Sequence, residues 1–126
     1  MKKALFALGL LPLLAACADT VQGKLRQTVY DVDSAYHVLA KPMPDVMTGK
    51  VPDVALTDTQ KAIAKRASQT VFNEIQSLEN SIEGSNSITQ TAVSALQTDF
   101  ASFETCWVGL KAGTTPDACA ALGGSK

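Results

Sequence analysis

Apolar residues recur every three or four positions over three long stretches of the chain, a spacing that places them on one face of an α-helix. The first stretch begins near Val21 and should end at Lys41, because Pro42 cannot continue the helical hydrogen bonds and restricts the residue before it. The pattern therefore predicts a first helix with one apolar face. That face consists of Val21, Leu25, Val29, Val32, Tyr36 and Leu39.

Two further helices are predicted on either side of a short Gly-Ser-Asn turn. Thr57 and Gln60 have the spacing of a capping box at a helix start, and Ser87 and Gln90 have the same spacing. Gly84 offers the left-handed conformation that commonly closes a helix. Because the turn is short, the two helices must run antiparallel. Their apolar faces are Ile63, Ala67, Val71, Ile75, Leu78 and Ile82, and then Ile88, Ala92, Leu96, Phe100, Phe103, Trp107 and Leu110.

The connection between the first two helices, residues 42–56, is long and rich in proline. It repeats the tripeptide Pro-Asp-Val at 44–46 and 52–54. A connection of this length in a compact domain is either functional or a crossover between helix ends, and we interpret it as a crossover. Its apolar residues predict that it packs along the helices; they are Val46, Met47, Val51, Val54 and Leu56.

A short fourth helix is predicted near the C-terminus, with Thr115 as its cap, Pro116 in its first turn and its end at Leu122. Residues 123–126 are interpreted as a flexible tail. The alternation typical of strands is scarce. We therefore predict an all-α fold, in which residues 21–122 form an antiparallel three-helix bundle with a short C-terminal helix.

The N-terminal segment has a different pattern. Two lysines precede an apolar stretch at residues 4–16, which has the layout of a cleaved export signal and is shorter than the roughly 20 residues that span a bilayer. The run Leu14-Ala15-Ala16-Cys17 then resembles the lipobox of bacterial lipoproteins. This resemblance to the lipoprotein class covers residues 1–17 only.

The resemblance implies cleavage before Cys17, a diacylglyceryl thioether on its sulfur and an acyl chain on the new amino group. Residues 1–16 would be the signal peptide, and residues 17–20 the lipid anchor with a short tether. Ala18 stands where an Asp would favour retention in the inner membrane. The resemblance thus implies the periplasmic face of the outer membrane, with that membrane as a partner. We predict an envelope protein as a further partner.

The charge of the mature chain is slightly negative. Removal of Lys2 and Lys3 from the 11 basic residues leaves 9, against 12 acidic residues. No basic patch occurs, which argues against nucleic acid as a partner. Residues 17–126 suffice for one compact domain and are too few for two.

The remaining cysteines, Cys106 and Cys119, are expected to form a disulfide that staples the short helix to the third long helix. Disulfides persist in the oxidising compartment that the export signal implies. Closing a loop of this size contributes about 3 kcal/mol in the chain-entropy model. A zinc pair is the competing interpretation, but the chain has one histidine and no Cys-x-x-Cys spacing.

Few side chains suggest chemistry. His37 follows a core position, and we interpret it as a histidine at the boundary or in solvent. Glu74, Glu79 and Glu83 lack the Glu-x-x-His pairing of di-metal bundles, so we expect solvated carboxylates. No haem-attachment sequence, phosphate loop or nucleophile elbow occurs. We predict no catalytic residue, no metal site and no cofactor.

These features favour a non-enzymatic accessory, scaffold or interaction lipoprotein of the cell envelope. Tyr30, beside the first apolar face, and Met47, in the long connection, are the candidate contact residues. One alternative is a module that binds a small apolar ligand or a lipid. Another is a phage-derived lysis or exclusion factor. Self-association through an exposed face stays open.

Overall fold

The computed structural model describes residues 2–123, with side chains from residue 21 to residue 122. Every regular element in this range is a helix, which confirms the all-α prediction. The predicted flexible tail lies outside the described residues except for Gly123, which ends the last helix. The helices are α1 (Lys2–Ala40), α2 (Met43–Met47), α3 (Asp58–Glu83), α4 (Gln90–Lys111) and α5 (Asp117–Gly123).

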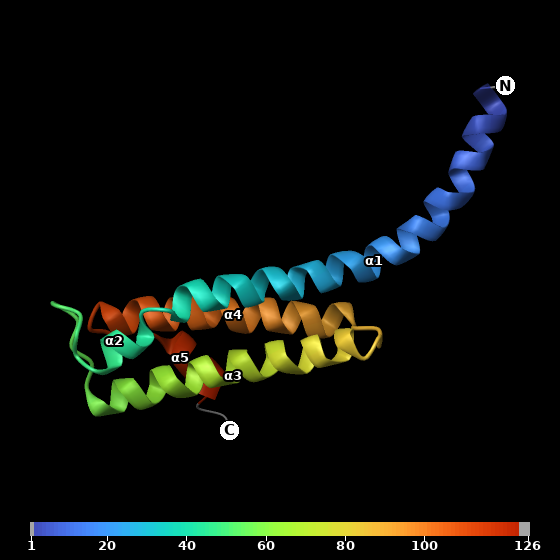
Figure 1. Ribbon diagram of the computed structural model, residues 1–126. Coiled ribbons are helices and arrows are strands. Elements are labelled where there is room, and N and C mark those ends of the chain that lie inside the picture. The colour runs from blue at the N-terminus through green and yellow to red at the C-terminus, as the bar shows by residue number, and fades with distance from the viewer. Residues whose placement is uncertain (1, 124–126) are drawn as a thin grey trace.

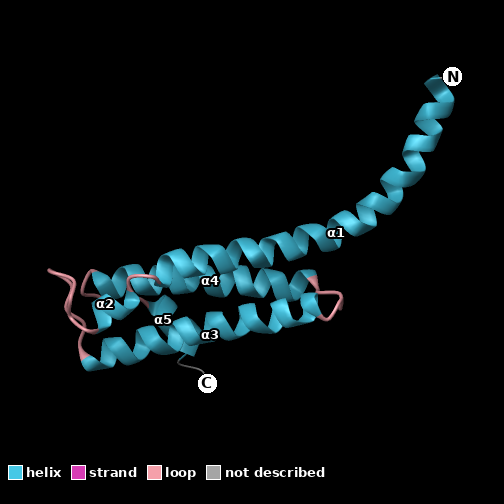
Figure 2. Cartoon of the chain, in the orientation of Figure 1, coloured by secondary structure: helices cyan, strands magenta, loops and turns pink. Residues whose placement is uncertain are grey.

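The three long helices α1, α3 and α4 lie side by side, and each contacts the other two (Figure 1). α1 and α4 run in one direction and α3 runs in the opposite direction (Figure 1). The short helix α5 packs against both α3 and α4. We call residues 21–122 the helical body, and its loops lie mainly at its two ends (Figure 2).

One apolar core runs through the helical body. Tyr36 of α1 lies where the three long helices meet, with ring centroids 6.0 Å from Phe72 of α3 and 5.8 Å from Phe103 of α4. Its hydroxyl group lies 2.7 Å from the hydroxyl of Ser68. Some of the described side chains form a fully buried set, and none of these is charged. The largest members of that set are Trp107, Phe103, Ile75, Leu96, Leu110 and Leu122.

The predicted face of the first helix is buried from Leu25 to Tyr36, but Val21 is 58% exposed. This part of the prediction is wrong because α1 continues past the turn that joins α3 to α4 (Figure 1). Gln22, next to Val21 in the chain, already pairs with Ile88 between α3 and α4. The centre of the predicted α3 face is buried. Its members Ile63, Leu78 and Ile82 are half-buried, and Ala64 is buried instead.

The start of α4 also differs from the prediction. Thr89 caps this helix, and its side-chain oxygen accepts a 3.0 Å hydrogen bond from the backbone N–H of Ala92. Ser87 is not the cap, because the chain around Ile88 is held by α1. The Gln22 side chain accepts from the Ile88 backbone N–H at 3.1 Å and donates to the Ile88 carbonyl at 2.9 Å. This pairing keeps Ile88 outside the helix.

Five of the seven residues in the apolar face predicted for the third long helix are buried, namely Ile88, Leu96, Phe103, Trp107 and Leu110. Ala92 and Phe100 are half-buried, whereas Val93 and Cys106 are fully buried. The prediction is therefore confirmed for most of this face and misses Val93 and Cys106.

The two ends of α3 show one confirmed prediction and one wrong prediction. Thr57 and Gln60 form both bonds of the capping box, at 3.0 and 3.1 Å. Gly84 has a φ of −79°, so the left-handed residue is Ser85, with a φ of 61°. The N–H of Asn86 bonds the Ser81 carbonyl at 2.8 Å, which closes α3 with a Schellman-type pattern one residue later than expected.

The connection after α1 packs against the core, as the apolar residues predicted. Met43, Val46 and Leu56 are buried, and Met47 is half-buried against the same core. The prediction missed the helix α2 inside this connection. Pro44 lies in the first turn of α2, where proline is tolerated because its absent N–H would have no helical partner.

Val71 and Val38 differ in burial, and we expect this difference to determine how much each contributes to the free energy of unfolding. Val71 of α3 is 0% exposed and Val38 of α1 is 76% exposed. Val71→Ala should lower the free energy of unfolding by about 2 kcal/mol, through lost apolar burial and a residual cavity. The matched change Val38→Ala should stay within about 0.5 kcal/mol. Urea denaturation measures both, and equal effects would contradict the described core.

Candidate functional site

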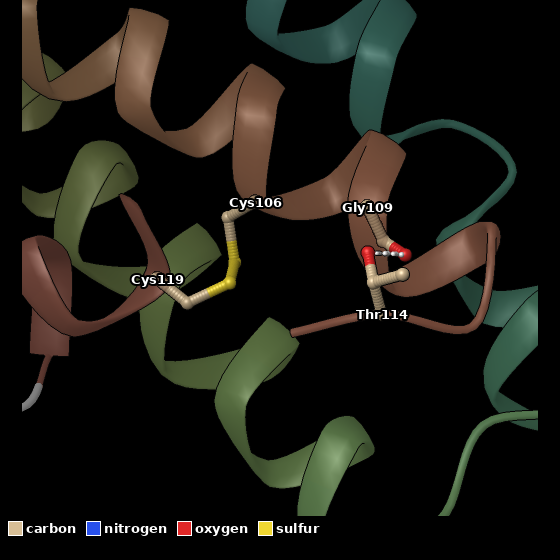
Figure 3. Close-up of a disulfide and its surroundings, with 4 residues drawn as sticks. All are labelled: Cys106, Gly109, Thr114 and Cys119. Atoms are coloured by element: carbon tan, nitrogen blue, oxygen red, sulfur yellow. Dashed lines mark hydrogen bonds between the residues drawn. A yellow bond between two sulfur atoms is a disulfide. The ribbon is translucent and has the colours of Figure 1, made fainter. Parts of the chain in front are cut away.

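Cys106 of α4 and Cys119 of α5 form a disulfide, which confirms the predicted pairing (Figure 3). Their Cα atoms are 4.8 Å apart, and both side chains are buried. The bridge joins α5 to α4, and α5 also packs against α3. Thr70 of α3 adds a 3.1 Å hydrogen bond to the carbonyl of Leu122 in α5.

The chain returns tightly from α4 to α5. Thr114 donates to the Gly109 carbonyl from both its backbone N–H, at 2.8 Å, and its hydroxyl, at 3.0 Å (Figure 3). A Cβ atom at Gly109 would collide with the ring of Pro116. Gly113, which lies between Gly109 and Pro116 in the chain, has a φ of +90°, a conformation that L side chains rarely adopt. Two glycines therefore allow the return that brings Cys119 to Cys106.

Met47 lies in a surface groove where α1, α2 and α3 meet. The groove has a volume of about 520 Å³. α1 and α2 supply mainly apolar groups to it, and α3 supplies a polar edge that includes Lys61 and Lys65. The lining residues include Tyr36, Ala40, Met43, Met47, Lys61 and Lys65. Sequence reasoning found Met47 and missed the other residues of this groove.

Tyr30, the second predicted contact residue, lies elsewhere. It is 43% exposed on α1 and does not line the groove that contains Met47. The structure thus does not bring the two predicted contacts together. The structure does not describe the side chain of Cys17, the predicted lipidation site, or the side chains of the predicted signal peptide.

One carboxylate differs from the prediction of solvated glutamates. Glu79 is half-buried, and desolvation raises its pKa from 4.5 to about 7, with further contributions from a hydrogen bond to Asp33 and from the charges of Asp33 and Glu83. Glu74 is also half-buried, whereas Glu83 is exposed. The prediction was wrong for Glu79 because Asp33 belongs to another helix, and no spacing along α3 shows it.

His37 is exposed, as predicted, and its Nε2 atom lies 3.0 Å from Oδ1 of Asp33, one turn earlier on α1. Within the part of the chain that has described side chains, no group of three or more His, Cys, Asp or Glu residues could hold a metal ion. In that same part, no helix is long and apolar enough to cross a membrane.

Comparison of the chain with protein-family models, with curated proteins and with solved structures gives no match.

Removal of the disulfide should destabilise the protein measurably. We expect the double variant Cys106→Ala/Cys119→Ala to lose about 3 kcal/mol of unfolding free energy, because the unfolded chain regains the freedom of the closed loop. Urea denaturation measures the loss. Wild-type protein treated with a reductant should match the double variant, and an unchanged unfolding midpoint in both would contradict a structural role for the bridge.

The raised pKa of Glu79 predicts a specific pH dependence. The folded state binds more protons than the unfolded chain between pH 4.5 and about 7, so this group's stabilisation is complete below 4.5 and is lost as the pH rises through 7. Glu79→Gln should therefore flatten the stability profile in this window. Above it, the variant should be more stable than the wild type by up to about 1 kcal/mol, after allowance for solvent screening.

The control for this experiment is Glu104→Gln, which removes an exposed carboxylate from α4. It removes one carboxylate, as Glu79→Gln does, but keeps Glu79, and it should therefore retain the slope that Glu79 causes between pH 4.5 and 7. Chemical denaturation over a series of pH values gives both profiles. A Glu79→Gln profile that runs parallel to the wild type would show that Glu79 ionises alike in the folded and unfolded states.

Proposed function

We propose that this protein is a lipid-anchored lipoprotein on the periplasmic face of the outer membrane, where it serves as a non-enzymatic accessory or scaffold for an envelope partner. The proposal rests first on the lipobox-like run that ends at Cys17. The described helical body begins at residue 21, so the anchor and the body are adjacent in the chain.

The disulfide is the observation that carries the proposal. Bridges of this kind persist in exported proteins and are rare where the cytosol keeps thiols reduced. Cys106 and Cys119 are paired, which leaves Cys17 as the third cysteine of the chain. The disulfide and the lipobox-like run that ends at Cys17 are both typical of exported proteins.

We further propose that the helical body acts as an antiparallel three-helix bundle with its short C-terminal helix stapled in place. Such a body is a rigid platform, since its helices share one core and its loops lie mainly at its ends (Figure 2). From Val21 to Ala40, α1 extends about 30 Å at 1.5 Å per residue. The end with α2 is therefore the end farther from the proposed anchor.

Cys17→Ser tests the anchor. Wild-type protein in a bacterial host should incorporate labelled palmitate and sediment with membranes, because two or three acyl chains hold a protein stably. The variant should lose the label and remain unprocessed.

The double variant Cys106→Ala/Cys119→Ala serves as the matched control, since it removes two cysteines and keeps Cys17. It should retain the label. Wild-type protein that is processed and exported without palmitate would refute the lipid anchor and leave the helical body unaffected.

A further inference from the structure

The groove at the junction of α1, α2 and α3 combines an apolar lining with two cationic side chains. Tyr36, Ala40, Met43 and Met47 supply apolar surface from α1 and α2. Tyr36 and Met43 are buried, so this part of the lining is continuous with the core. Methionine side chains adapt their shape readily, which suits a surface that contacts flexible apolar chains.

The two cations of the groove are Lys61 and Lys65, one turn apart on α3 and hence on the same face of the helix. Lys61 is half-buried and Lys65 is exposed. No carboxylate lines the groove, and no described carboxylate forms an ion pair with either lysine. Two positive charges thus border an apolar surface, and Asp53, which lines a neighbouring hollow with Lys61, forms no ion pair with it.

The charge of the chain is distributed unevenly around this groove. Residues 41–66, which include the connection and the start of α3, carry five basic and three acidic side chains. Residues 67–122 carry one basic and six acidic side chains. An anionic ligand is therefore attracted to the end of the helical body where the groove lies and is repelled from the remainder of α3 and α4.

We propose that this groove binds a single-chain amphiphile with an anionic head group, such as a fatty acid or a lysophospholipid. The alkyl chain lies along Met43, Met47 and Ala40, and the carboxylate or phosphate pairs with Lys61 and Lys65. The inference does not depend on the lipid anchor, because all the residues involved belong to the helical body.

The dimensions of the groove agree with this occupant. Its volume of about 520 Å³ falls within the range of small-molecule sites, roughly 300–1,000 Å³. Along α3 the lining runs from Lys61 to Gln69, which is about 12 Å at 1.5 Å per residue. A medium-length alkyl chain has a comparable length.

The test is a titration of the purified full chain in nanodiscs, with the methionine methyl groups isotope-labelled for NMR. Decanoate and decyl phosphate represent the two kinds of anionic head, and decanol is the neutral probe. We expect both anions to shift the methyl signals of Met43 and Met47. Decanol should bind at least about fivefold more weakly than either anion, because it gains no charge-assisted hydrogen bonds.

Three variants test where the head group binds. Lys61→Gln/Lys65→Gln should weaken decanoate and decyl phosphate at least about fivefold and leave decanol unchanged. The matched control Lys41→Gln/Lys50→Gln removes the same charge from exposed positions outside the groove and should change little. Ala62→Glu, at an exposed position of the lining, places a carboxylate beside the lysines and should abolish binding of both anions.

A difference between the two anions identifies the natural head group, because a preference for decanoate indicates a fatty acid and a preference for decyl phosphate indicates a lysophospholipid. Equal affinity for decanol and the anions, or no effect of the Lys61 and Lys65 changes, would overturn the proposal. Methyl shifts caused by an acidic amphipathic peptide, with none caused by the amphiphiles, would overturn it in favour of a protein partner.

Discussion

The buried ring of Tyr36 is the contact on which the arrangement of the helices depends. It touches Phe72 of α3 and Phe103 of α4, and its hydroxyl pairs with Ser68, so one side chain of α1 fixes the positions of both other long helices. Because the ring is buried, its hydroxyl requires a partner, and Ser68 supplies one at 2.7 Å. The same ring also forms part of the groove wall, so that core and groove share one anchor.

The sequence predicted the elements well where local rules decide them. The Thr57 cap, the end of α1 near Pro42 and the helix after Pro116 depend on neighbours in the chain, and all three are present. The pairing of Cys106 with Cys119 was also predictable, since the other cysteine belongs to the N-terminal segment. These features follow from backbone hydrogen bonding and from a count of cysteines.

The prediction failed where distant residues decide the local structure. Gln22 holds Ile88 from 66 residues away and thereby moves the start of α4 to Thr89. The carboxyl group of Asp33, on α1, contributes to the raised pKa of Glu79, on α3. The groove likewise appears only after α2 forms inside the long connection and lies against α1 and α3. A spacing rule along one segment contains no information about such partners.

The pairing of Gln22 with Ile88 also bears on the order in which the protein folds. α3 and α4 are joined by a short turn, so their contacts close short loops, whereas the pairing of Gln22 with Ile88 spans 66 residues, and loop-closure entropy rises with length. Proteins form local contacts faster than distant ones. We therefore expect the hairpin of α3 and α4 to form before Gln22 pairs with Ile88. The exact start of α4 at Thr89, which that pairing sets, is then fixed only after the hairpin itself has formed.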